Sequence, residues 1–156
     1  MRLSRKADYA LRVLFTLVDR HGLGQGPISM NELAKLNDVP KRFLEHIMLD
    51  LKSQGWVDST PGRSGGYVLV QNPERITLGQ VIRHFDGLVA PVSCVSISEF
   101  EPCTQAARCR FRRVMMDIRN LIASHLDNAT LASVALSTPL ADRDVFRLEL
   151  ISGDGI

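Results

Sequence analysis

All three cysteines of the 156-residue chain, Cys94, Cys103 and Cys109, fall within one short stretch that also contains proline and serine. Cysteines that serve only as small apolar side chains are expected to be spread over the core positions of several helices. Thiolates gathered in one loop are typical ligands of zinc and of iron-sulfur clusters, and they are also the groups that redox switches use. The stretch therefore predicts a metal, cluster or thiol site.

The charge and hydropathy of the chain limit where such a site can operate. Lys and Arg number 19 against 17 Asp and Glu, but residues 1–12 and 108–119 are locally basic, which fits a local contact with a polyanion. No uninterrupted apolar segment follows Met1, and no run approaches the roughly 20 apolar residues of a membrane span. We expect a cytoplasmic protein with no membrane contact, where an odd number of cysteines argues against a disulfide framework.

The N-terminal half has the pattern of a helix-turn-helix. An apolar stripe at three- and four-residue steps predicts a first helix from Leu3 to about Gly22. Ser29, with Glu32 three residues later, predicts the start of a second helix over 30–36, and Pro40 the start of a third that ends at Gly55. Two helices joined by a short turn, the second opening with Lys41-Arg42, are typical of DNA-binding proteins.

A β-hairpin is predicted directly after the third helix. Residues 56–60 and 67–70 are strand-like, and a turn of glycine, proline and Arg63 joins them. A hairpin in this place is a wing, whose glycines let the backbone approach a phosphate while the arginine supplies charge. Residues 1–86 are therefore predicted to form a winged helix-turn-helix domain.

The rest of the chain divides into a loop, a long helix and a tail. Thr77 caps a helix that continues to Phe85, and the cysteine-bearing loop follows over 87–110. Apolar positions from Phe111 to Leu126 predict a long helix that packs against a second copy of itself, with a short final helix completing the segment 111–136. Beyond Pro139 no pattern is clear, so residues 137–156 are expected to form a loosely held tail. The predicted fold class is mainly α.

Several short motifs together resemble one protein family. They are Met1-Arg2-Leu3-Ser4, Tyr9-Ala10, Phe43-Leu44-Glu45, Gly55-Trp56-Val57, Gly62-Arg63-Ser64-Gly65-Gly66-Tyr67, Ile76-Thr77-Leu78 and the three late cysteines. Over about residues 1–136 the chain resembles the Rrf-two (Rrf2) family of bacterial winged helix-turn-helix regulators. Its members include the iron-sulfur regulator IscR, the nitric-oxide sensor NsrR and the iron regulator RirA.

The resemblance implies a homodimer, joined through the long helix, that binds a palindromic DNA operator, with one recognition helix in each half-site. It implies a regulator, expected to be a repressor, rather than an enzyme. The predicted DNA-contacting residues are Lys41 and Arg42 of the recognition helix and Arg63, Ser64 and Gly65 of the wing tip. Glu45 stands where some members use an acidic side chain to choose among operators, a role that a carboxylate can fill by accepting from cytosine.

For the cysteines, the resemblance favours an iron-sulfur cluster, either 2Fe-2S or 4Fe-4S, that senses nitric oxide, redox state or iron supply. A cluster-free thiol switch and a zinc site remain the alternatives, although no C-x2-C pair of the zinc type is present. A cluster needs a fourth ligand. Some members have a histidine three residues after the last cysteine, but Arg112 occupies that position here. In others an aspartate of the partner subunit reaches over, and Asp8 matches it, although Asp8 also suits a surface ion pair with Arg12.

Overall fold

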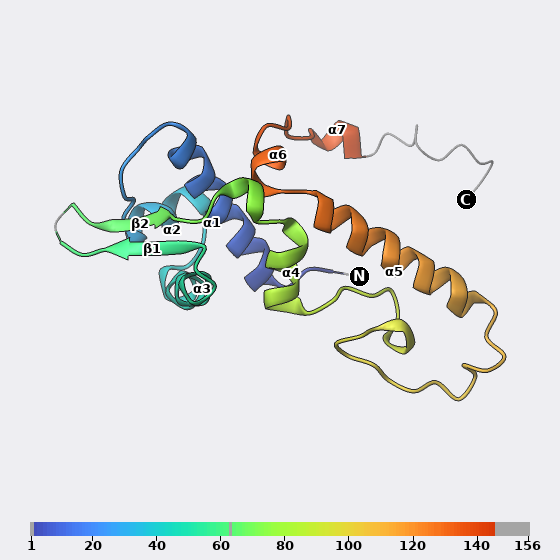
Figure 1. The fold of residues 1–156 in the computed structure, drawn as a ribbon. Coiled ribbons are helices and arrows are strands. Elements are labelled where there is room, and N and C mark those ends of the chain that lie inside the picture. Colours follow the sequence, from blue (N-terminus) through green and yellow to red (C-terminus); the bar gives the residue numbers. More distant parts are fainter. Residues whose placement is uncertain (1, 63, 146–156) are drawn as a thin grey trace.

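A computed structural model describes residues 2–62 and 64–145 of the chain. It is mainly helical, with a two-stranded antiparallel wing, as predicted (Figure 1). The α-helices are α1 (Arg5–Gly22), α2 (Met30–Asn37), α3 (Lys41–Ser53), α4 (Leu78–Asp86), α5 (Phe111–Asn128), α6 (Leu131–Ala135) and α7 (Asp142–Val145). The strands are β1 (Val57–Thr60) and β2 (Gly66–Leu69), and short 3-10 helices cover Pro73–Arg75 (η1) and Ser93–Val95 (η2).

Helix α1 is the centre of the compact half of the molecule. The side chain of Ser4 accepts from the backbone N–H of Ala7 and caps the helix, and residues on one face, including Val13 and Leu14, are fully buried. This face packs against α2, α3, α4, α6 and β2 (Figure 1). The apolar stripe predicted from the sequence therefore forms the part of the core on which α2, α3 and the wing strand β2 pack.

The turn between α2 and α3 contains no glycine, but it has the geometry that glycine often supplies. Asp38 takes the left-handed conformation, with φ 52° and ψ 48°, which Asp tolerates better than most residues. Ser29 accepts from the N–H of Glu32 at the start of α2, and Pro40 precedes α3. The two helices pack on each other and on α1, as a helix-turn-helix requires.

The wing forms the predicted hairpin, and the backbone of Ile28 pairs with it as well. β1 and β2 pair from Val57↔Leu69 to Thr60↔Gly66, and Ile28 exchanges two backbone hydrogen bonds with Tyr67 at 3.1 and 2.8 Å. A Cβ atom on Gly66 would lie 2.3 Å from the carbonyl oxygen of Ile28, so only glycine allows this close approach. The hairpin is therefore tied to the segment ahead of α2.

The C-terminal half extends away from this core as an arm. Thr77 and Gln80 form a complete capping box at α4, and the chain then runs through the cysteine loop into α5, which projects to the right in Figure 1. A backbone bridge between Thr77 and Thr130 holds the start of α6 at the core, where Leu131 is buried. No helix in the described part is both long and apolar enough to cross a membrane.

One helical turn lies within the segment that the sequence predicts to be a loosely held tail. Residues 142–145 form α7, which is stabilised locally: Asp144 accepts from the N–H of Ala141 through its side chain and donates its own N–H to the carbonyl of Ala141. Four residues are too few to show a helical period, so the pattern could not reveal it. Residues 146–156 of the predicted tail lie outside the described residues.

Candidate DNA interface and cysteine loop

The predicted DNA-contacting residues of α3 all lie on its exposed side. Lys41, Arg42 and Glu45 are exposed, while Leu44, Ile47, Met48 and Leu51 fix the opposite side in the core. The first turn of α3 carries no acidic residue and no side-chain cap. Its free amides and the two basic side chains together favour a phosphate at this end of the helix.

A salt bridge fixes the wing relative to this helix. The Lys52 ammonium, in the last turn of α3, lies 2.7 Å from the carboxylate of Asp58 and 2.8 Å from the hydroxyl of Ser59 on β1. The hydrogen bond from Lys52 lowers the pKa of Asp58 below its ordinary value. Both side chains are exposed, so the pair serves to orient the wing more than to stabilise the fold.

Of the three wing-tip residues, Ser64 is exposed, Gly65 is half-buried and Arg63 lies outside the described residues, so its contact stays a prediction. Gly65 closes the turn: its N–H donates to the carbonyl of Gly62 at 3.0 Å. A Cβ atom at this position would lie 2.1 Å from the carbonyl oxygen of Thr60 and 2.8 Å from a backbone atom of Pro61. Only glycine fits, because backbone atoms on this side cannot move away as a side chain would.

We therefore expect Gly65→Ala to distort the wing and to lower DNA affinity by about tenfold, while the fold loses about 1 to 3 kcal/mol. Titration of labelled promoter DNA by fluorescence anisotropy measures the first effect and urea unfolding the second. Gly26→Ala is the matched control, because nothing lies within 4 Å of a Cβ atom there and its φ is not positive. Equal DNA affinity of the two variants would contradict a role for the tip geometry.

The cysteine loop brings two of the three thiols to one pocket. Cys94 and Cys109 are half-buried and line a cavity of about 410 Å³ together with Phe100 and residues of α5. Cys103 is exposed and does not line it. Within residues 2–62 and 64–145 of this single chain, no three Cys, His, Asp or Glu side chains lie close enough together to hold a metal ion.

The predicted fourth ligand, Asp8, lies on α1. Its carboxylate is 2.7 Å from the guanidinium of Arg12, one turn later, and both side chains are about half exposed at 44% and 49%. The hydrogen bond from Arg12 to Asp8 raises the pKa of Arg12 above its ordinary value. The surface ion pair read from the sequence is therefore present, and the carboxylate is accessible from outside the chain.

Two arginines of α5 hold the loop, and the sequence reasoning missed this role. Arg112 donates from Nε and from one terminal nitrogen to the carbonyl of Cys94, at 3.3 and 3.0 Å. Arg119 donates to the carbonyl of Val95 at 2.7 Å. Two arginines of the basic segment 108–119 thus have a structural role, whereas the polyanion contact of this segment stays a prediction. The seven-residue spacing of the two arginines, which puts them on one face of a helix, was the available signal.

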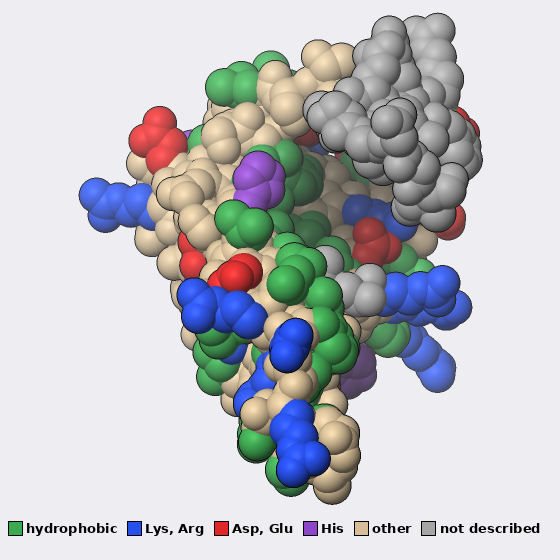
Figure 2. All heavy atoms as spheres, turned by 90° about the vertical axis from the view of Figure 1, so that its right-hand side faces the viewer, with side chains coloured by type: hydrophobic (Ala, Val, Ile, Leu, Met, Phe, Trp, Pro, Cys, Tyr) green, Lys and Arg blue, Asp and Glu red, His purple; other side chains and the backbone are tan. Residues whose placement is uncertain are grey.

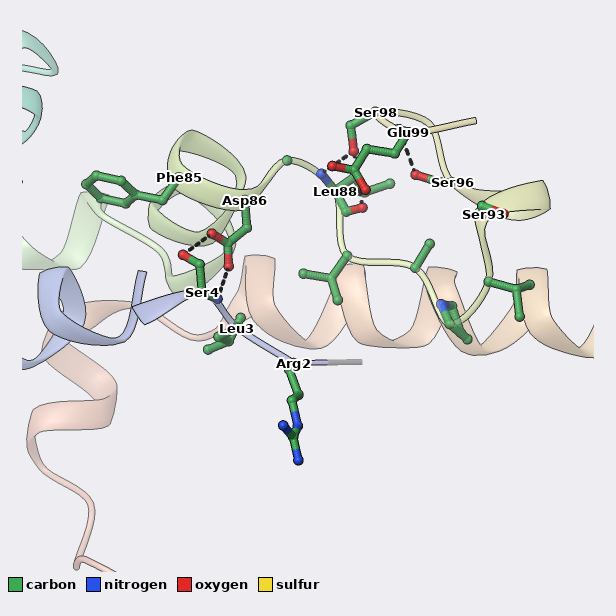
Figure 3. A pocket seen from close by; sticks show the side chains of 15 residues that line it. Arg2, Leu3, Ser4, Phe85, Asp86, Leu88, Ser93, Ser96, Ser98 and Glu99 are labelled. Carbon is green, nitrogen blue, oxygen red and sulfur yellow. Dashed lines mark hydrogen bonds between the residues drawn. The ribbon is translucent and has the colours of Figure 1, made fainter. Parts of the chain in front are cut away.

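Separate polar contacts lie between the start of the loop and α3. The Ser98 hydroxyl accepts from the N–H of Leu88, and Asp86, at the end of α4, accepts from both the N–H and the hydroxyl of Ser4 (Figure 3). Lys6, in the first turn of α1, lies over the ring of Phe85 and 2.6 Å from Asp50 of α3. The contacts between Ser4 and Asp86 border a cavity of about 670 Å³ between the N-terminal segment and residues 85–99.

Helix α5 leaves several of its apolar side chains uncovered in the single chain. None of its 18 residues is buried, and Phe111, Val114 and Leu121 are exposed. Figure 2 views the molecule from the end where Figure 1 places the loop and the start of α5, and in its lower part basic and apolar side chains lie side by side. An apolar helix face of this extent is typical of a protein interface.

Comparison with known proteins agrees with this arrangement. Residues 3–136 match the Rrf2 family, described as iron-dependent transcriptional regulator. The chain is 37% identical over 145 residues to the rrf2-like HTH-type transcriptional regulator of Rhodobacter capsulatus, covering 89% of this chain and 96% of that protein.

Two solved structures show the same fold. CymR, the global cysteine regulator of Bacillus subtilis, superposes with a TM-score of 0.69 at 31% identity, over 89% of this chain and 99% of that one. IscR of T. potens gives a TM-score of 0.65 at 25% identity, over 90% and 94%. Because the matched family consists of transcriptional regulators, the prediction that the chain is not an enzyme is confirmed. It belongs to the Rrf2 family of DNA-binding transcriptional regulators.

Proposed function

We propose that the protein is a homodimeric repressor whose binding to a palindromic operator is controlled by an iron-sulfur cluster, held by Cys94, Cys103 and Cys109. The observation that carries the proposal is the placement of the thiols. All three cysteines are free and lie in the loop directly before α5. Two of them line one pocket at the start of that helix. Their position ahead of an uncovered helix puts them beside the proposed dimer interface.

The donor set fits a cluster that is completed from outside the chain. Thiolates are the usual ligands of iron-sulfur clusters, and the loop supplies three of the four required. The described residues of one chain do not gather three donors around a single point, so loading must draw Cys103 toward the pocket. We propose Asp8 of the partner subunit as the fourth ligand, because it matches the aspartate that the family resemblance implies and its carboxylate is accessible. Arg112, beside the pocket, is a guanidinium that cannot ligate.

An incompletely thiolate-ligated cluster supplies an iron that can react with nitric oxide or oxygen or be lost when iron is scarce. The chain's own residues pass the change on. Ser98 and Asp86 connect the start of the loop to Ser4, and Lys6 connects the same turn of α1 to Asp50 on α3. A shift of the loop would move these contacts and alter the spacing of the two recognition helices in the dimer.

Anaerobic purification tests the proposal. We expect iron and acid-labile sulfide, a visible absorption band, and operator binding that changes on exposure to nitric oxide, oxygen or a chelator. Protein that stays colourless and binds no iron after reconstitution with iron and sulfide would refute the cluster and leave the DNA-binding function in place. Operator binding that does not weaken as salt rises would count against recognition through phosphate contacts.

We expect Asp8→Ala to weaken retention of the cluster, measured as faster loss of iron to a chelator and a changed visible spectrum. Arg12→Ala is the matched control, because it breaks the same ion pair and leaves the carboxylate in place. An exposed pair of this kind contributes only about 0.3 to 0.5 kcal/mol, so both variants should fold normally. Equal iron loss from the two variants would remove Asp8 from the ligand set.

A cluster-free thiol switch is the second candidate. The sharing of one pocket by Cys94 and Cys109, together with the absence of three gathered donors in the described part of the chain, favours it. It predicts operator binding by iron-free protein that diamide changes and dithiothreitol restores. The same reconstitution experiment therefore decides between the two candidates.

A further inference from the structure

Two side chains of α5 contact the backbone at Cys94 and the next residue. Cys94 lies in the middle of η2, a single 3-10 turn closed by backbone hydrogen bonds from Val95 to Val92 and from Ser96 to Ser93. This turn packs on α5. Cys109 comes two residues ahead of the first residue of α5 and so has its position set by the start of the helix. Cys94 has no such covalent proximity and needs contacts to hold it there.

Arg112 and Arg119 provide those contacts. Arg112 directs two nitrogens at the carbonyl of Cys94, and Arg119 directs one at the carbonyl of the next residue, Val95, whose side chain is buried. Hydrogen bonds from a charged donor are stronger than neutral ones, and the planar guanidinium fixes direction as well as distance. Both arginines are half-buried, and both line the pocket that Cys94 and Cys109 also line.

We propose that Arg112 and Arg119 are positioning residues that clamp the Cys94 turn onto α5 and so hold the Cys94 and Cys109 thiols at one pocket. The clamp acts through backbone carbonyls and leaves both thiols free to react or to ligate. The importance of the clamp for binding a cluster rests on the proposed function. The effect of the clamp on the placement of the two thiols is independent of that proposal. The clamp uses the residue that stands three positions after the last cysteine, so this position contributes to the site without acting as a ligand.

The test measures how strongly the two thiols are held together in the full-length, metal-free protein carrying Cys103→Ser. Equilibration with reduced and oxidised glutathione forms a Cys94–Cys109 disulfide: the two thiols lose two electrons and two protons, and one glutathione disulfide becomes two glutathione thiols. The equilibrium constant gives the effective concentration of one thiol at the other. We expect Arg112→Ala with Arg119→Ala to lower it by about tenfold.

Matched variants separate the clamp from charge and from general stability. Arg110→Ala with Arg113→Ala removes two positive charges from the same region, and Arg113 lines the same pocket without bonding the loop carbonyls. We expect this control to stay within about twofold of the parent. Arg112→Lys with Arg119→Lys keeps the charge but loses the planar fork, and it should remain near the alanine value. Circular dichroism verifies folding, and the two single alanine variants carry the same test.

Equal effective concentrations in the clamp and control variants would overturn the inference, as would full recovery with lysine, which would assign the effect to charge alone. Reconstitution with iron and sulfide separates this outcome from the proposed function. If the protein with all three cysteines takes up no iron but the clamp variants lower the effective concentration, the cluster proposal fails and the clamp stands. If iron uptake is normal and the effective concentration is unchanged, the reverse holds.

Discussion

Replacing Lys41 and Arg42 together with alanine should produce the largest loss of operator affinity of any exposed pair in the protein. Both side chains are exposed at the start of α3, where the helix has no acidic residue and no cap to compete for the phosphate. An arginine that reads a base contributes about 1 to 3 kcal/mol, and each lost phosphate contact lowers the salt dependence of log K by about one unit. Anisotropy titrations at several salt concentrations measure both quantities.

Arg75→Ala is the control, because its side chain is exposed in η1, so a positive charge is lost away from α3. Long-range charge is screened within about 8 Å at physiological salt, and the control should therefore bind almost normally. If control and test variants lose equal affinity, α3 is not the element that contacts DNA.

Substituting serine for Cys94 or Cys109 should abolish retention of iron and sulfide while leaving the fold intact. A serine hydroxyl is a poor ligand for iron in place of a thiolate, and the remaining two cysteines cannot hold a cluster by themselves. Neither thiol is fully buried, so the exchange removes little packing and should change the free energy of unfolding by less than about 1 kcal/mol. Iron and sulfide assays and urea unfolding of the metal-free protein measure the two effects.

Met116→Leu is the control for this pocket, since Met116 lines it with Cys94 and Cys109 and the substitution conserves its volume. It should load iron as the parent does. Normal iron and sulfide content in both serine variants would show that the loop is not the cluster site. Loss of folding in the metal-free variants would instead assign the cysteines to packing.

Local patterns predicted most of the fold because the signals were local. The apolar stripes of α1 and α5, the cap at Thr77 and the glycine-rich wing turn each depend on residues within a few positions of one another. The helix-turn-helix was harder, because its turn contains Asp38 where such turns often contain glycine. A backbone conformation that several residue types can adopt leaves only a weak trace in one sequence.

The sequence predicted the candidate ligands of the site but not the side chains that hold the loop in place. The clustering of three cysteines was visible, whereas the bonds from Arg112 and Arg119 to backbone carbonyls depend on how the loop folds back onto α5. The contact between Ser4 and Asp86 spans 82 positions, and no local pattern encodes it. Arginines read as a basic cluster could equally have faced solvent, because charge alone does not say which carbonyl lies nearby.

The uncovered face of α5 has a consequence for how much protein the cell must make. Helix α5 packs on α4 and on η2, but none of its residues is buried in its own chain, so in the proposed dimer its stability would follow mass action. At low abundance, α5 and the loop ahead of it would be the first parts to open and the first that proteases cut. The level of the regulator would then set its own lifetime, with newly made chains protected only once enough of them have met.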